Sequence, residues 1–152
     1  MERVMWCLAF VLVAAGAAGS GTVEAQQQRP NLDELGVAIE GYDPVAYFVE
    51  GRAREGSPNL VYMHEGSTYR FASAENRELF TKDPERYAPA YGGWCAYAMA
   101  DGTYAPIDPE AWVIHNDRLY LNFSRRINRR FEDAINSYIE NADREWRTLA
   151  DE

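Results

Sequence analysis

Twelve residues decide the fold of this chain: Leu60-Val61-Tyr62-Met63-His64-Glu65-Gly66-Ser67-Thr68-Tyr69-Arg70-Phe71. Both flanks are rich in residues that favour strands, and Gly66 supplies the positive φ that a tight turn requires. The stretch therefore predicts a β-hairpin. Ser73 is a good N-cap for a helix from Ala74 to about Lys82, which the Asp83-Pro84 step would end.

The same plan returns 51 residues further on, where Trp112–Phe123 predicts a second hairpin with its turn at Asn116-Asp117. Four identities accompany the shift: His64 with His115, Tyr69 with Tyr120, Ser73 with Ser124, and Phe80 with Phe131. A hairpin followed by a helix, met twice, indicates an α+β domain. We expect a small antiparallel sheet of β-hairpins packed against helices.

The C-terminal part has the strongest helical pattern. From Ser124 to about Ala150, apolar residues recur at steps of three and four, and charged residues fill the other face. We therefore expect a long C-terminal amphipathic helix. Shorter elements are predicted as well: a turn over Gly41–Pro44, a strand-forming run over Val45–Val49, and a helix from about Gly93 to Ala100.

The first 25 residues have the features of a secretory signal peptide. An uncharged apolar run spans Val4–Ala18, and Val23-Glu24-Ala25 fits the small-x-small pattern of a cleavage site. We predict cleavage after Ala25, a flexible mature N-terminus over residues 26–36, and a single domain over residues 37–150. The run is shorter than the roughly 20 apolar residues of a membrane span. We therefore expect no stable membrane insertion after cleavage, and a periplasmic or secreted mature protein.

The chain is acidic, with a formal net charge of −9. Removing residues 1–25 takes away Glu2, Arg3 and Glu24, a net −1, and leaves −8. Such a domain repels phosphate backbones, so no nucleic-acid partner is expected. The one basic cluster, formed by Arg125, Arg126, Arg129 and Arg130, is interpreted as a solvated helix face with local ion pairs.

The stretch Tyr91–Met99 holds Cys95, the one cysteine that remains after cleavage removes Cys7, so the mature chain can form no internal disulfide. Cys95 and Met99 are four residues apart and would share one face of a helix. Thiolate and thioether are soft ligands that suit Cu(I), and His64 or Met63 would complete a copper site if the first hairpin packs nearby. The alternative is that Cys95 and Met99 are core residues, because both types are usually buried.

Catalytic machinery is not predicted. A Cys95 nucleophile with His64 or His115 as its base would need an orienting group and two oxyanion donors, and no local motif signals them. The sequence contains no nucleophile elbow, phosphate-binding loop or dinucleotide fingerprint. We therefore expect a protein that is not an enzyme.

Several segments together resemble the exported YHS domain-containing proteins and cover essentially the whole predicted mature chain. They are Gly41–Phe48, Thr68–Asn76, Asp83–Pro89, Tyr91–Tyr97 and Ala105–Trp112, with Phe80 between the second and third. The resemblance implies a YHS-like domain over residues 37–150. The short YHS domain and the related TRASH domain are associated with heavy-metal proteins such as copper-transporting ATPases, so the resemblance also implies an association with a heavy metal.

The metal-binding relatives carry cysteines at three positions that match Ala46, Ala72 and Asn76 here, and none of these residues can supply a thiolate. We expect a small non-catalytic binding protein whose ligand is a metal ion, with a copper ion as the candidate, a small molecule or a protein. Two alternatives stay open. One is a structural or protein-interaction module without metal, and the other is a thiol redox protein that acts through Cys95.

Overall fold

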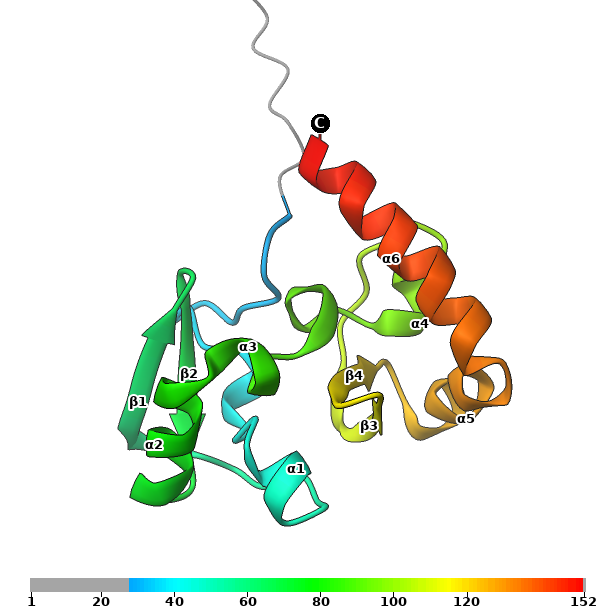
Figure 1. Ribbon diagram of the computed structural model, residues 1–152. Helices are drawn as coiled ribbons and strands as arrows, with labels where there is room; N and C mark the ends of the chain where they lie inside the picture. Colours follow the sequence, from blue (N-terminus) through cyan, green and yellow to red (C-terminus); the bar gives the residue numbers. More distant parts are fainter. Residues whose placement is uncertain (1–27, 152) are drawn as a thin grey trace, which may run out of the picture.

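The computed structural model describes residues 28–151, so the predicted signal peptide and its cleavage site lie outside the described residues. Figure 1 shows two small antiparallel sheets packed with helices, including a long C-terminal helix, which confirms the predicted α+β fold class. Within this described range, no helix is both long enough and apolar enough to cross a membrane.

The first half of the described chain, called unit 1 below, spans residues 39–87. Its elements are the 3₁₀ helix η1 (Ile39–Gly41), helix α1 (Ala46–Val49), strands β1 (Ser57–His64) and β2 (Ser67–Phe71), and helices α2 (Ala74–Lys82) and α3 (Pro84–Tyr87). The predicted first hairpin and the helix after it are confirmed. Ser73 caps α2 as expected, because its hydroxyl accepts a hydrogen bond from the backbone N–H of Asn76 at 3.1 Å.

The second half, called unit 2, spans residues 90–151. Its elements are the 3₁₀ helix η2 (Ala90–Gly93), helix α4 (Ala96–Met99), strands β3 (Asp108–His115) and β4 (Arg118–Asn122), and helices α5 (Arg125–Asp133) and α6 (Ile135–Asp151). The predicted second hairpin is confirmed, and Ser124 caps α5 by accepting from the backbone N–H of Ile127 at 3.3 Å.

The two units repeat one arrangement of elements. β1, β2 and α2 begin and end 51 residues before β3, β4 and α5, respectively. Each strand pair also has one irregularity in its ladder, between Ser57 and Val61 in unit 1 and between Asp108 and Trp112 in unit 2, again 51 residues apart. The hairpins do not join, and each forms its own two-stranded sheet. The sparse sequence identities therefore reflect two copies of one supersecondary structure.

A shared core connects the units. The larger cluster of buried residues combines Phe71 and Phe80 of unit 1 with Leu119 and Leu121 of unit 2, all of which are 0% exposed. A second cluster lies within unit 2 and includes Phe131. Because both strand leucines of unit 2 are buried in the core of unit 1, neither unit could be removed without exposing apolar surface of the other.

The run Val45–Val49 was expected as a strand because of its composition, but it contains helix α1 instead. The reason is the side chain that precedes it. Asp43 Oδ1 accepts hydrogen bonds from Val45 N at 2.8 Å and Ala46 N at 3.3 Å, which satisfies free N–H groups at the start of a helical turn. Strand propensity is weak and loses to this local interaction.

The two predicted helices of unit 2 are each interrupted. The segment Gly93–Ala100 becomes helical only at α4, because Gly93 is left-handed, Trp94 is extended, and the N-cap Cys95 has a non-helical backbone (φ −56°, ψ 115°). The long C-terminal helix breaks at Ala134 (φ −143°, ψ 45°) into α5 and α6. The break changes the direction of the chain between α5 and α6, and Ala142 of α6 packs in the same cluster as Phe131 of α5.

Candidate functional site

A left-handed turn at the start of unit 2 positions the candidate site. Tyr91, Gly92 and Gly93 have φ values of 55°, 60° and 83°. Glycine adopts such values freely, but for Tyr91 they are strained, and strain of this kind persists only where the surrounding structure enforces it. Strained residues cluster at functional sites, so the contacts of Tyr91 are of particular interest.

The side chain of Tyr91 is 1% exposed and ends in a small charged cluster. Its hydroxyl donates to Asp143 Oδ1 at 2.9 Å, and Arg118 Nη1 donates to the same oxygen at 2.9 Å. The Arg118 guanidinium also lies over the rings of Tyr91 and Tyr120, at 5.0 and 5.5 Å from their centroids. Burial, reinforced by Asp143, raises the pKa of Tyr91, so its phenol remains a hydrogen-bond donor.

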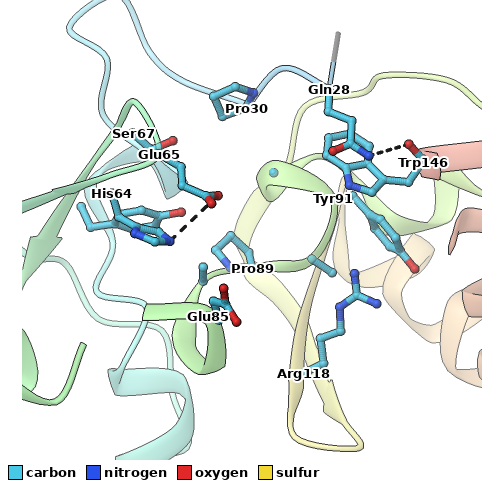
Figure 2. Close-up of a pocket in the computed structure, with 14 residues that line it drawn as sticks. Gln28, Pro30, His64, Glu65, Ser67, Glu85, Pro89, Tyr91, Arg118 and Trp146 are labelled. Carbon is cyan, nitrogen blue, oxygen red and sulfur yellow. Dashed lines mark hydrogen bonds and ion pairs between the residues drawn. The ribbon is translucent and has the colours of Figure 1, made fainter. Parts of the chain in front are cut away.

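A cleft of about 420 Å³ lies beside this cluster, between the two units (Figure 2). His64, Glu65 and Glu85 line it from unit 1, while Tyr91 and Arg118 line it from unit 2. Figure 2 shows these side chains on opposite walls of one space. The volume falls in the range of small-molecule sites, roughly 300–1,000 Å³.

Residues that precede unit 1 form a third side of the cleft. Gln28 Nε2 donates to Trp146 O at 2.7 Å, and Asn31 N donates to Gly92 O at 2.9 Å. The sequence predicts a flexible N-terminus over residues 26–36, whereas the described part, residues 28–36, makes these specific contacts. Composition does not reveal them because both partners lie far along the chain, in η2 and α6.

Gly92 is required where this N-terminal segment crosses the turn. A Cβ atom at Gly92 would lie 3.1 Å from Pro30 Cα and 3.3 Å from Arg29 O, both of them backbone atoms. Trp94 fixes the same segment, since its Nε1 donates to Arg29 O at 2.7 Å. The paired glycines of the sequence therefore serve a close approach between backbones, with Gly92 at the point of contact.

Cys95 and Met99 lie one helical turn apart, as predicted, with Met99 N donating to Cys95 O at 3.0 Å, but the side chains of the three predicted copper ligands contact different groups of residues. Cys95 lies in the core that joins the units, and Met99 lies in the second cluster within unit 2. His64 lines the cleft, with Nε2 3.9 Å from Glu65 Oε2 and its ring 6.1 Å from that of Phe80. Across residues 28–151, no group of three or more His, Cys, Asp or Glu side chains is arranged to hold a metal ion. The copper site stays a prediction.

Cys95 is part of a buried polar network. Its thiol lies 3.7 Å from Asn122 Oδ1, which also accepts a hydrogen bond from Tyr97 N at 3.0 Å. The Asn122 amide in turn donates to Asn128 Oδ1 at 2.8 Å. Burial raises the pKa of the Cys95 thiol, so the sulfur is protonated at neutral pH and acts as a weak donor.

We expect the Cys95 thiol to resist a thiol-specific reagent in the native protein and to react fully after denaturation, because it is 1% exposed and protonated. The reaction is followed at neutral pH with and without guanidinium, and Cys95→Ala provides the background. Rapid modification of the native protein would support the redox alternative.

Titration of wild type and Cys95→Ala with Cu(I) tests the predicted copper site. Equal binding of Cu(I) by the two proteins would contradict that site.

The three positions that the YHS resemblance would align with cysteines meet in space, around the carboxylate of Asp43. Its oxygens accept hydrogen bonds from Ala46 N at 3.3 Å, Ala72 N at 2.8 Å and Asn76 Nδ2 at 2.7 Å. Asp43 is 0% exposed. At this place the chain therefore has a fully hydrogen-bonded carboxylate that links three segments of unit 1.

Comparison of the chain with protein-family models, with curated proteins and with solved structures found no match. The YHS resemblance therefore depends on the sequence motifs alone and remains a prediction.

The sequence singles out Tyr91–Met99 and predicts that its chemistry lies at Cys95. The structure shows that Tyr91, at the other end of the stretch, faces the cleft, while Cys95 is buried in the core. The roles of Arg118 and Asp143 were missed as well. They come from β4 and α6, and no local motif indicates that a hairpin residue and a helix residue meet at one tyrosine.

Proposed function

We propose that this chain is an exported, non-catalytic binding protein of the YHS type that holds a small ligand in the cleft between its two units. The cleft itself carries the proposal. Its walls come from the N-terminal segment, from unit 1 and from unit 2, and it lies directly beside the strained, buried Tyr91. Pockets between structural units are common locations for small-ligand sites.

The charges on the walls indicate the chemistry of the ligand. On the unit 2 side, Arg118 is 40% exposed and uses one nitrogen for Asp143, so other guanidinium N–H groups remain for an anionic group. On the unit 1 side, Glu65 and Glu85 are exposed carboxylates. A small zwitterion, such as an amino acid or a short peptide, matches both walls at once.

The surroundings of the histidine and the cysteine support a non-catalytic role. Cys95 lies in the core and does not line the cleft. His64 does line it, with Glu65 beside it and the ring of Phe80 behind it. General-base catalysis needs a nucleophile within hydrogen-bond reach of the imidazole, and the thiol that would serve is buried elsewhere.

We expect free amino acids and dipeptides to bind in the cleft and change the fluorescence of Trp146, which lines it. Glu85→Gln should weaken binding about tenfold, because it removes one charge that faces the ammonium group. Titration by fluorescence and by calorimetry measures the effect. Glu75→Gln is the matched control, since Glu75 is an exposed carboxylate on α2 that does not line the cleft.

The two variants separate the outcomes. Equal affinities of Glu85→Gln and Glu75→Gln would show that any observed binding occurs outside the cleft. If none of the probes binds to the wild-type protein, the zwitterion site is wrong and the alternative of a structural or protein-interaction module gains support.

A further inference from the structure

Helix α5 presents a concentrated positive surface on an acidic protein. Four of the fifteen lysine and arginine residues of the chain lie in its nine residues: Arg125, Arg126, Arg129 and Arg130. All four are exposed, while Asn128 and Phe131 hold the opposite side of the helix in the interior. Figure 1 shows α5 at the edge of the molecule, on the side away from the first hairpin.

These arginines have few carboxylate partners in the described part of the chain. Arg125 lies 3.5 Å from Glu110, with both side chains largely exposed. No carboxylate of the described residues lies within ion-pair distance of Arg126, Arg129 or Arg130. Such exposed pairs contribute little to stability, so the arginines are available for another interaction.

The fold itself does not require this charge. Helix α2 occupies the equivalent place in unit 1, and the residues that correspond to the four arginines are Ala74, Glu75, Glu78 and Leu79. Arg125 and Arg126 also lie in the first turn of α5, where the helix dipole disfavours positive charge. The arginines of α5 therefore reduce the stability of unit 2. The equivalent helix α2 of unit 1 shows that this kind of helix can fold without them.

An apolar side chain stands beside the arginines. Phe123, immediately before the N-cap of α5, is 55% exposed, and the equivalent residue of unit 1 is Ala72. An exposed aromatic ring next to a group of arginines matches the interfacial region of a membrane, where phosphate groups lie just outside the acyl chains.

We propose that Phe123 and the arginine face of α5 dock this protein reversibly on an anionic phospholipid surface. Arginine binds phosphate through a pair of parallel N–H donors, and the ring of Phe123 would enter the boundary between headgroups and acyl chains. The net charge of −9 opposes contact elsewhere on the protein and so selects this face for the encounter. Nucleic acid fits less well, because the patch is one short helix with a single exposed aromatic ring, and the acidic remainder of the protein would repel a phosphate backbone.

The test uses the protein as it is purified from the cells that produce it, and mass spectrometry identifies its N-terminal residue. Sedimentation with phosphatidylcholine vesicles gives the background, and vesicles that also contain phosphatidylglycerol give the specific signal. Arg126→Gln/Arg129→Gln/Arg130→Gln should lower the specific partition coefficient at least about tenfold. Arg52→Gln/Lys82→Gln/Arg147→Gln, which removes the same charge at other exposed positions, should change it far less.

Further measurements keep the proposal falsifiable. Phe123→Ser should weaken binding without altering its salt dependence, and the thermal midpoint of the arginine variant should stay unchanged or rise, since unfavourable charge is removed. Equal binding of the two triple variants would overturn the proposal, as would absence of any extra binding to phosphatidylglycerol. Binding to a duplex oligonucleotide but not to vesicles would overturn it in favour of nucleic acid.

Discussion

Asp43→Ala is expected to lower the free energy of unfolding by roughly 4 kcal/mol or more, because each buried polar group left without a partner costs about 1–3 kcal/mol. The carboxylate accepts four hydrogen bonds inside the protein, from Val45 N, Ala46 N, Ala72 N and Asn76 Nδ2. Alanine would leave all four donors without this acceptor, and three of them are buried while Ala72 N is half-buried. Urea denaturation followed by circular dichroism measures the loss.

The damage should be large because Asp43 connects segments that are far apart in the chain. Ala72 follows strand β2 and Asn76 lies in the first turn of α2, 29 and 33 residues after Asp43. The same carboxylate fixes the start of α1. One side chain therefore holds together the loop before α1, the end of the hairpin and the helix that covers it.

Two further variants test this mechanism. Asp43→Asn places an amide N–H donor among four groups that already donate, so it should also lower the free energy of unfolding. The double variant Asp43→Asn/Asn76→Asp should recover part of that free energy, because the carboxylate introduced at position 76 supplies an acceptor for the new amide. Asp33→Ala is the matched control, since Asp33 also accepts two backbone N–H groups, of Leu35 and Val37, but is exposed. If Asp33→Ala and Asp43→Ala cost the same, burial is not the cause.

The features that sequence predicts well are those encoded by neighbouring residues. Both hairpins, with turns at Glu65-Gly66 and Asn116-Asp117, follow from strand-forming flanks around residues that tolerate positive φ. The serine caps are equally local. The fold class follows from these elements, because a hairpin with a helix can bury its apolar face in few ways.

The features that sequence misses depend on contacts between distant residues. The helical turn after Asp43 wins over the strand propensity of Val45–Val49 because a buried acceptor is present there. The break at Ala134 cannot be seen in a pattern of three- and four-residue steps that continues through it. The cleft is hidden for the same reason, since His64 of unit 1 and Arg118 of unit 2 line one space only after the units have packed.

Phe80→Ala is expected to lower the free energy of unfolding by about 3–5 kcal/mol, the usual cost of a phenylalanine cavity in a core. The ring is 0% exposed and lies 4.7 Å from the ring of Tyr69, 5.2 Å from Phe71 and 6.1 Å from Tyr62. Leu79→Ala on the same helix is the matched control. Leu79 is 38% exposed, so its loss should cost less than about 1 kcal/mol.

Because of where the tryptophans lie, Phe80→Ala also tests whether units 1 and 2 unfold together or independently. Trp94, Trp112 and Trp146, the tryptophans of the described part of the chain, all lie in unit 2, whereas Phe80 lies in unit 1. Because Leu119 of unit 2 is buried in the same core as Phe80, loss of the ring should destabilise both units together. The urea midpoint by tryptophan fluorescence should then fall as far as the midpoint by circular dichroism. A fluorescence midpoint that stays at its wild-type value would show instead that the two units unfold independently, despite their common core.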